Sequence, residues 1–285
     1  NTEMLQSVDL EQIRRVTRDW RRRALTTALV PTMGNLHDGH LALVREAREH
    51  ADRVVASIYV NPAQFGEGED YGSYPRTPDT DRVALEASGC DLLFAPGHNT
   101  VYPPGIKNSI RLVASPDLAA PLEGQFRPGH FDGVLTVVAR LFNLVGPDVA
   151  VFGEKDFQQL LLIRRMVEDL SFDIRIVSVP TVREHNGLAM SSRNRYLRAE
   201  ERSAAVRLKT VLSEVVEQVR NNPSHREQAE QGALSRLESL GFRVDYVAVR
   251  RADNLAEPSE EDAPMRVLVA VRCGTTRLID NMKII

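Results

Sequence analysis

The sequence is poor in the residues that define several large classes of protein. Its 285 residues include only two cysteines, Cys90 and Cys273, which are too far apart for a zinc or redox motif. No apolar run approaches the roughly 20 residues that a membrane-spanning helix needs, and the N-terminal residues do not resemble a signal peptide. The sequence therefore argues against a disulfide scaffold and predicts a cytoplasmic protein without a membrane partner.

An excess of positive charge is also missing. The 39 acidic residues outnumber the 36 lysines and arginines, which gives a formal net charge of -3 at pH 7. Such a balance creates no basic field, so we expect no nucleic-acid partner. Only four of the 36 basic residues are lysines. A lysine inside a motif is therefore informative, and Lys155 occupies such a place.

The first two thirds of the chain alternate between helical and strand-like hydrophobic patterns. Helices are expected at residues 8–23, 38–51, 75–89, 133–145 and 156–170, and strands at 25–32, 53–61, 91–96, 148–153 and 172–180. This alternation predicts an α/β fold, a doubly wound parallel sheet of the Rossmann type. Ligands of such sheets bind beyond the carboxyl ends of the strands.

The pattern changes after about residue 183. Two helices are expected at 199–220 and 226–242, followed by three strands at 243–254, 265–274 and 276–284 that could form an antiparallel sheet. We therefore predict a Rossmann-type domain over residues 1–183. A smaller domain of helices and antiparallel strands would cover residues 184–285.

The stretch HDGH, residues 37–40, places two histidines at the start of a predicted helix, directly after a strand. Residues three apart share one face of a helix, and the N-terminus of a helix favours phosphate. Histidine can donate a hydrogen bond to phosphate oxygens or share a proton as charge builds. Two alternatives remain at this point: a metal-binding pair, or two surface histidines.

Two further stretches carry candidate nucleotide ligands, one after a predicted strand at the same edge and one in a loop expected at the domain boundary. In FGEKDFQQL, residues 152–160, Lys155 could neutralise a triphosphate and Asp156 could bind a ribose hydroxyl, unless the charges only cap a helix. In AMSSRNRYL, residues 189–197, Ser191, Ser192 and Arg193 are suitable phosphate ligands or form a polar turn.

The stretch 60–81 is long and rich in glycine and proline, which is typical of a mobile lid. It carries Gln64, and its last residues include Asp79 and Asp81, which could hold Mg²⁺ or begin a helix. Arg127 and His130 are expected near the same face of the sheet.

Six motifs in order resemble the pantothenate synthetase family, also called pantoate–β-alanine ligase: PTMGNLHDGH, NPAQF, YPRT, RPGHF, FGEKDFQQL and MSSRNRYL. More widely, they are similar to the nucleotidyltransferases with a HIGH motif. The resemblance implies an ATP-dependent condensation of (R)-pantoate with β-alanine through a pantoyl adenylate, with release of AMP and pyrophosphate. It also implies a Mg²⁺-dependent homodimer in which the smaller C-terminal domain closes over the site.

The resemblance assigns roles to individual residues. His40 would be the acid or proton donor, His37 a phosphate ligand, and Lys155 would neutralise the departing pyrophosphate. Gln64 and Gln159 would hold pantoate, with Gln64 also bordering β-alanine. The ATP site would comprise Met33, Gly34, Asn35, Leu36, His37, Asp38, Gly39, His40, Gly153, Glu154, Lys155, Asp156, Val182, Met190, Ser191, Ser192 and Arg193.

Two positions are less regular. Asp81 is the candidate magnesium carboxylate, although Asp79 fits the pattern about as well. Ala63 stands where the family usually has methionine, in NPMQF, so we expect a trimmed apolar wall beside Gln64.

Two other functions agree with parts of the sequence. One is a related cytidylyl- or adenylyltransferase, which leaves its nucleotide on the product. The other is a regulatory protein that binds a nucleotide without turnover. Gln64 and Gln159 favour a small hydroxy acid as substrate, and the intact histidine pair with Lys155 argues against a loss of turnover.

Overall fold

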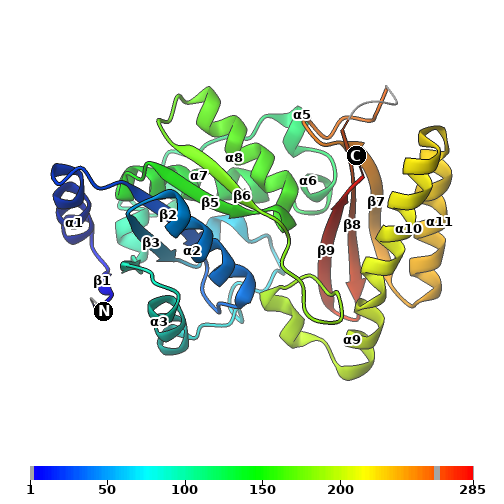
Figure 1. Cartoon of the computed structure of the whole chain (residues 1–285), viewed down its shortest axis with the longest axis horizontal. Helices are drawn as coiled ribbons and strands as arrows, with labels where there is room; N and C mark the ends of the chain where they lie inside the picture. The colour runs from blue at the N-terminus through cyan, green and yellow to red at the C-terminus, as the bar shows by residue number, and fades with distance from the viewer. Residues whose placement is uncertain (1–2, 260–263, 285) are drawn as a thin grey trace.

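The computed structural model describes residues 3–259 and 264–284, and Figure 1 shows its two sheets side by side. The larger sheet is parallel and has the order β1-β4-β3-β2-β5-β6. Its strands are β1 (Leu5–Ser7), β2 (Thr27–Thr32), β3 (Arg53–Ile58), β4 (Leu92–Phe94), β5 (Val149–Gly153) and β6 (Arg175–Val179). The strand order reverses between β2 and β5, so a crevice opens at their carboxyl ends.

Helices cover both faces of this sheet because side chains alternate along each strand. In β2, Ala28 and Val30 pack under α2 (Asp38–His50) and α3 (Pro78–Ala87), whereas Leu29 faces the opposite side. That opposite side is covered by α1 (Leu10–Arg22), α7 (His130–Val145) and α8 (Phe157–Asp169). The predicted doubly wound parallel sheet is confirmed.

Several short elements are absent from the sequence prediction, and α7 begins three residues before its predicted start. The unpredicted elements are β1, α4 (His98–Val101), α5 (Pro116–Ala119), α6 (Glu123–Phe126), η1 (Pro62–Gln64), η2 (Ile106–Asn108), η3 (Glu154–Asp156), η4 (Ser192–Tyr196) and η5 (Pro223–His225). Segments of three to five residues are too short to show hydrophobic periodicity.

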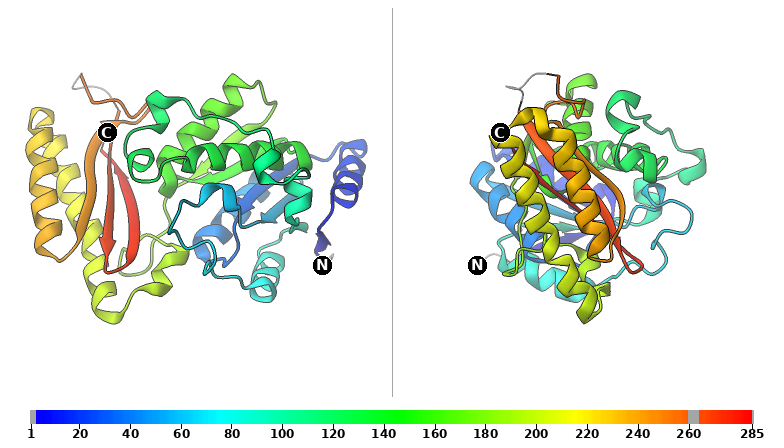
Figure 2. Two further views of the ribbon diagram at one scale, coloured as in Figure 1. Left: turned by 180° about the vertical axis from the view of Figure 1, so that it is seen from behind. Right: turned by 90° about the vertical axis from the view of Figure 1, so that its right-hand side faces the viewer.

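The smaller sheet is antiparallel and contains β7 (Arg243–Arg251), β8 (Met265–Cys273) and β9 (Thr276–Lys283), as predicted. Figure 2 shows α10 (Arg207–Asn221) and α11 (Arg226–Ser239) side by side on its outer face. The predicted helix 199–220 is divided into α9 (Ala199–Ala205) and α10. Val206, the turn residue between them, has helical dihedrals (φ −58°, ψ −31°).

The inner face of the smaller sheet packs against the larger sheet's helices. Arg277 on β9 donates two hydrogen bonds to Glu123 on α6, at 2.6 and 2.7 Å, and Tyr246 on β7 donates a third at 2.8 Å. These contacts connect the larger sheet's part of the chain with the smaller sheet. The domain boundary between residues 183 and 184 stays a prediction. None of the described helices is long and apolar enough to cross a membrane.

Candidate active site

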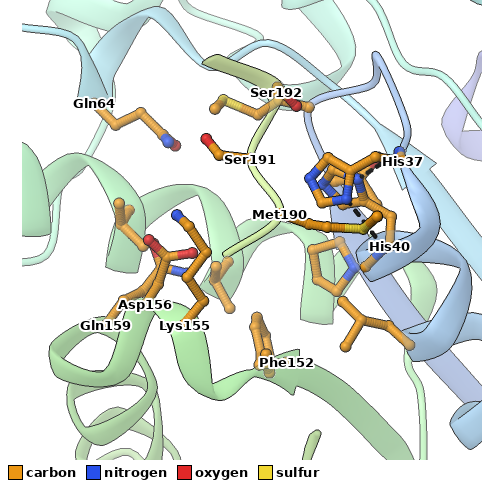
Figure 3. Close-up of a pocket in the computed structure, with 18 of the residues that line it drawn as sticks. His37, His40, Gln64, Phe152, Lys155, Asp156, Gln159, Met190, Ser191 and Ser192 are labelled. Atoms are coloured by element: carbon orange, nitrogen blue, oxygen red, sulfur yellow. Dashed lines mark hydrogen bonds between the residues drawn. The ribbon is translucent and has the colours of Figure 1, made fainter. Parts of the chain in front are cut away.

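A cavity of about 250 Å³ lies beyond the carboxyl ends of β2, β5 and β6. In Figure 3, His37 and His40 lie on one side of it and Lys155 on the other, with the loop of Met190 and Ser191 between them. Most of the residues expected from the sequence line it: Met33, His37, Gly39, His40, Gln64, Gly153, Lys155, Asp156, Gln159, Val182, Met190, Ser191, Ser192 and Arg193. Five separate stretches of the chain therefore meet at the edge predicted from the strand pattern.

The two histidines are oriented by the first turn of α2. His37 is the N-cap, and its Nδ1 accepts the backbone N–H of Gly39 at 3.1 Å. His40 Nδ1 accepts the backbone N–H of His37 at 3.2 Å. Because a backbone N–H can only donate, neither Nδ1 carries a proton, and a neutral ring holds its proton on Nε2. A Cβ at Gly39 would lie 2.7 Å from His37 Cε1, so only glycine permits this arrangement.

Both rings are neutral at pH 7. Burial lowers the pKa of His40 to about 3, with further contributions from His37 and Lys155. The pKa of His37 falls to about 4, first through burial and then through the charge of Lys155. The pair therefore offers neutral Nε2–H donors to an anion, and binding that anion would favour the protonated form of either ring.

Lys155 belongs to η3, just after β5. Among the described residues, no hydrogen bond or ion pair engages its ammonium group, which lines the cavity. Its main chain is fixed from the smaller sheet, since Asn281 Nδ2 donates to the carbonyl oxygens of Glu154 at 2.9 Å and Lys155 at 3.0 Å. The Glu154 side chain points away, toward Ser178 and Arg266, so it is not one of the cavity residues.

Gln64 is oriented by a buried hydrogen-bond network. Asn61 Nδ2 donates to the carbonyl oxygen of Gly133 and to Gln64 Oε1, both at 3.1 Å, and Tyr102 donates to Asn61 Oδ1 at 2.8 Å. Gln64 therefore presents its NH₂ group to the cavity as a donor. A Cβ at Gly133 would lie 2.2 Å from the carbonyl oxygen of Ala63, so α7 can approach this loop only through a glycine.

Residues 6–283 match the sequence model of a family described as pantoate-beta-alanine ligase. The chain belongs to the pantoate–β-alanine ligase family. A pantothenate synthetase of Xylella fastidiosa (strain 9a5c) is 52% identical over 98% of this chain and 100% of its own length. One from Xanthomonas axonopodis pv. citri (strain 306) is also 52% identical, with the same shares covered.

Solved structures of this ligase family share the fold. Pantothenate synthetase from Thermus thermophilus superposes with a TM-score of 0.89 at 46% identity, covering 99% of both chains. Pantoate-beta-alanine ligase from Francisella tularensis, complexed with beta-gamma ATP and beta-alanine, gives a TM-score of 0.83 at 32% identity and covers 98% of this chain and 97% of its own.

Asp81, the candidate magnesium ligand, is hydrogen-bonded to the backbone and does not face the cavity. Both carboxylate oxygens of Asp81 accept backbone N–H groups, from Asn35 at 2.8 Å and Leu36 at 2.9 Å, and Thr77 donates a third bond at 3.0 Å. Asp81 is buried and does not line the cavity. It anchors the loop before α2, and Asp79 is exposed on the first turn of α3.

The remaining ATP-site candidates belong to that anchored loop or, in the case of Asp38, to the first turn of α2. Gly34, Asn35, Leu36 and Asp38 do not line the cavity. Asn35 accepts from Ser192 through its carbonyl oxygen at 3.2 Å and from Arg195 through its side chain at 3.0 Å. The loop therefore supports both the histidine helix and the Ser192 loop without facing the ligand space itself.

Two arginines of the cavity hold the loop after Gln64. Arg127 forms a bidentate pair with Glu69, at 2.7 and 2.8 Å, and Arg193 does so with Asp70, at 3.2 and 2.9 Å. Burial would raise the pKa of Glu69, but its bonds to Arg127 outweigh this and lower the pKa to about 2. Arg193 is thus tied to the loop as well as exposed to the cavity.

The sequence prediction missed the residues that orient the site without lining it. Asn61, Tyr102 and Asn281 act through neighbours, and only Asn61 lies inside a motif, NPAQF. Ala63, the departure from the family motif, packs against the core and lies outside the cavity lining.

Proposed function

We propose that this protein condenses (R)-pantoate with β-alanine in a reaction driven by ATP, forming pantothenate, AMP and pyrophosphate. One observation carries the proposal: a chain that matches the ligase family over residues 6–283 gathers His37, His40, Lys155, Gln64 and Gln159 around one cavity. The reaction would proceed through a pantoyl adenylate.

In the first step, the pantoate carboxylate attacks the α-phosphorus of ATP and the bond to the β,γ-pyrophosphate breaks. Positioning and neutralisation of charge are the main demands of such a transfer. The Nε2–H groups of His37 and His40 would donate to phosphate oxygens, and Lys155 would stabilise the departing pyrophosphate. Gln64 would donate through its NH₂ group to an oxygen of pantoate.

In the second step, the β-alanine amine attacks the acyl carbon and AMP leaves with the electron pair of the carbon–oxygen bond. The amine loses a proton on forming the amide. Gln159 would hold pantoate through both steps. Ser191, Ser192 and Arg193 would keep the phosphate of the leaving AMP in place, while Val182 and Met190 contact the base.

The residues of the cavity are better suited to bind Mg²⁺ that is already coordinated by ATP than to form a metal site on their own. Among the described residues, no group of three or more His, Cys, Asp or Glu could hold a metal ion, and Asp81 is engaged by backbone N–H groups. Mg²⁺ commonly takes one or two carboxylates together with substrate phosphates. Asp156 is the carboxylate in the cavity that could serve, and the ion would neutralise phosphate charge.

A half-reaction assay tests the proposal. Incubation with ATP, Mg²⁺ and pantoate should exchange labelled pyrophosphate into ATP without β-alanine, and addition of β-alanine should produce AMP and pantothenate. Formation of ADP, or exchange that does not require pantoate, would contradict it. A nucleotidyltransferase would leave the nucleotide on its product, and a non-catalytic binder would release no pyrophosphate.

The resemblance also supports two properties of the whole molecule. We propose a homodimer and a cytoplasmic location. Light scattering after gel filtration would measure the mass, and a monomer across the micromolar range would contradict the first of these.

A further inference from the structure

A second hollow of about 720 Å³ lies between the loop 66–73 and the β8–β9 hairpin. It shares Arg127, His130, Lys155 and Asp156 with the active-site cavity, so the two spaces adjoin at these side chains. We call it the interdomain groove. It offers a route to the reaction centre that does not pass the histidine pair.

Most charged groups of the interdomain groove are paired. The carboxylates of Glu69 and Asp70 are bound by Arg127 and Arg193. Glu123 is bound by Arg277, whose Nε also donates to Asp245 at 2.8 Å. Asp280 is bound by Arg183 at 2.7 Å. These pairs cancel most of the charge inside the groove.

Arg272 on β8 is different. It lines the groove, its side chain is half-buried, and among residues 3–259 and 264–284 no carboxylate or carbonyl pairs with it. Its Nε is buried without a hydrogen-bond partner. The chain therefore leaves the charge of Arg272 unneutralised, and an anion in the groove beside its guanidinium group would be stabilised.

The strand register adds to the positive charge at Arg272. It lies directly opposite Arg243 on β7 and Arg277 on β9, so the three side chains share the inner face of the sheet. Arg277 is neutralised by Glu123 and Asp245. Arg243 is exposed outside the groove lining and has no partner among the described residues. Two adjacent unpaired guanidinium groups therefore face the same side.

The groove holds unpaired charge of the opposite sign as well. Glu67 and Asp156 line it, and neither side chain has an ion-pair partner in the described part of the chain. Lys155 and Asp156 also line the active-site cavity, where ATP would engage them, so among the described residues Arg272 and Glu67 are the unpaired charges that remain in the groove. One cation and one anion suit a small zwitterion better than a simple anion such as pyrophosphate.

We infer that Arg272 is a docking point for the carboxylate of an ω-amino acid, through which β-alanine enters the active site. The inference rests on the proposed function, because it is in that reaction that such a zwitterion is a substrate. ATP and pantoate must occupy the cavity first, since β-alanine attacks their product. The groove would then admit β-alanine while the cavity is filled, with Arg272 holding its carboxylate at the outer part.

The experiment compares Arg272→Gln and Arg272→Lys with the wild type at saturating ATP and pantoate. A matched control is Arg14→Gln, because Arg14 is exposed on α1, at the opposite end of the molecule in Figure 1. For Arg272→Gln, kcat/KM for β-alanine should fall about 10-fold while kcat changes less than about 2-fold. Arg272→Lys should recover part of the loss, and Arg14→Gln should lose nothing.

Two further measurements separate docking from a structural role. Pantoate-dependent pyrophosphate exchange needs no β-alanine and should be unchanged in Arg272→Gln. With β-alaninamide, which keeps the amine but lacks the carboxylate, the wild type and Arg272→Gln should have equal kcat/KM.

Three results would overturn the inference: an unchanged KM for β-alanine, an equal loss with β-alaninamide, or weakened exchange. If Arg272→Gln changed only the inhibition constant for pyrophosphate, the inference would also be overturned, because Arg272 would then act in product release. Absence of pantothenate formation by the wild type would instead contradict the proposed function, so the two failures are distinguishable.

Discussion

The imidazole rings of His37 and His40 lie 4.0 Å apart, centroid to centroid, and the Nδ1 of each accepts a backbone N–H from the same helical turn. The first turn of α2 thus fixes the tautomer of both rings. Their Nε2–H groups remain as donors, and this arrangement underlies the first two predictions.

Replacement of His40 by alanine should lower kcat by about 10²–10⁴-fold, because a donor to the phosphate is lost. Steady-state rates with all three substrates measure this, and circular dichroism checks the fold. The exposed His225 provides the control, since His225→Ala should leave kcat unchanged. Near-normal turnover of His40→Ala would remove His40 from the chemistry.

The stability of the protein should fall as the pH decreases below about 6.5, the pKa of histidine in an unfolded chain. The folded-state pKa values of His37 and His40 are about 4 and 3, so between pH 7 and 5 the unfolded chain binds more protons. Each such histidine should reduce the free energy of unfolding by about 1–2 kcal/mol over this range.

Urea denaturation of the wild type and His40→Gln at pH 7 and 5 measures this effect. The variant should lose less stability than the wild type over the interval, whatever its absolute stability. Equal losses in the two proteins would show that His40 titrates normally in the folded state.

Lys155→Ala should slow pantoate-dependent pyrophosphate exchange by about 10²–10³-fold, because the charge of the leaving pyrophosphate is no longer neutralised. Single-turnover adenylation is the direct measurement. Lys107→Ala removes an exposed lysine of η2 and should have no effect. Unchanged adenylation in Lys155→Ala would contradict the role given to Lys155.

Asp81→Asn should destabilise the protein by about 1–3 kcal/mol, because an amide cannot accept both loop N–H groups as the carboxylate does. The Mg²⁺ concentration for half-maximal activity should stay the same. Asp79→Asn, on the exposed side of α3, should change neither quantity. A marked rise in the Mg²⁺ concentration required for activity, without loss of stability, would indicate that Asp81 binds the metal.

Tyr102→Phe should raise KM for pantoate by about 5- to 10-fold and change KM for ATP by less than about 2-fold. Burial raises the pKa of Tyr102 to about 12, so its hydroxyl is a permanent donor to Asn61, which in turn orients Gln64. Equal changes in both KM values would indicate a general loss of structure.

The parts of the fold with long periodic patterns were predictable from the sequence, because burial repeats along α2, α7 and the strands. Part of the cavity lining was predictable because His37 and Lys155 follow strand ends, whereas Met190 and Gln159 do not. Asn281 could not be predicted, since its contacts join residues more than 120 positions apart. The hydrogen bonds of Asp81 could not be predicted for a similar reason: a carboxylate looks the same in sequence whether it faces a metal or a backbone.

Gly133 sets a limit on redesign of this protein. Any side chain there would clash with the Ala63 carbonyl and the main chain of Gln64. The cavity therefore cannot be reshaped beside Gln64 by a substitution at Gly133. Room for a bulkier hydroxy acid would have to come from the apolar residues of the same helix that line the cavity, which are Val134, Val137, Val138 and Leu141. Truncating those valines would widen the substrate range while the amide of Gln64 keeps its direction.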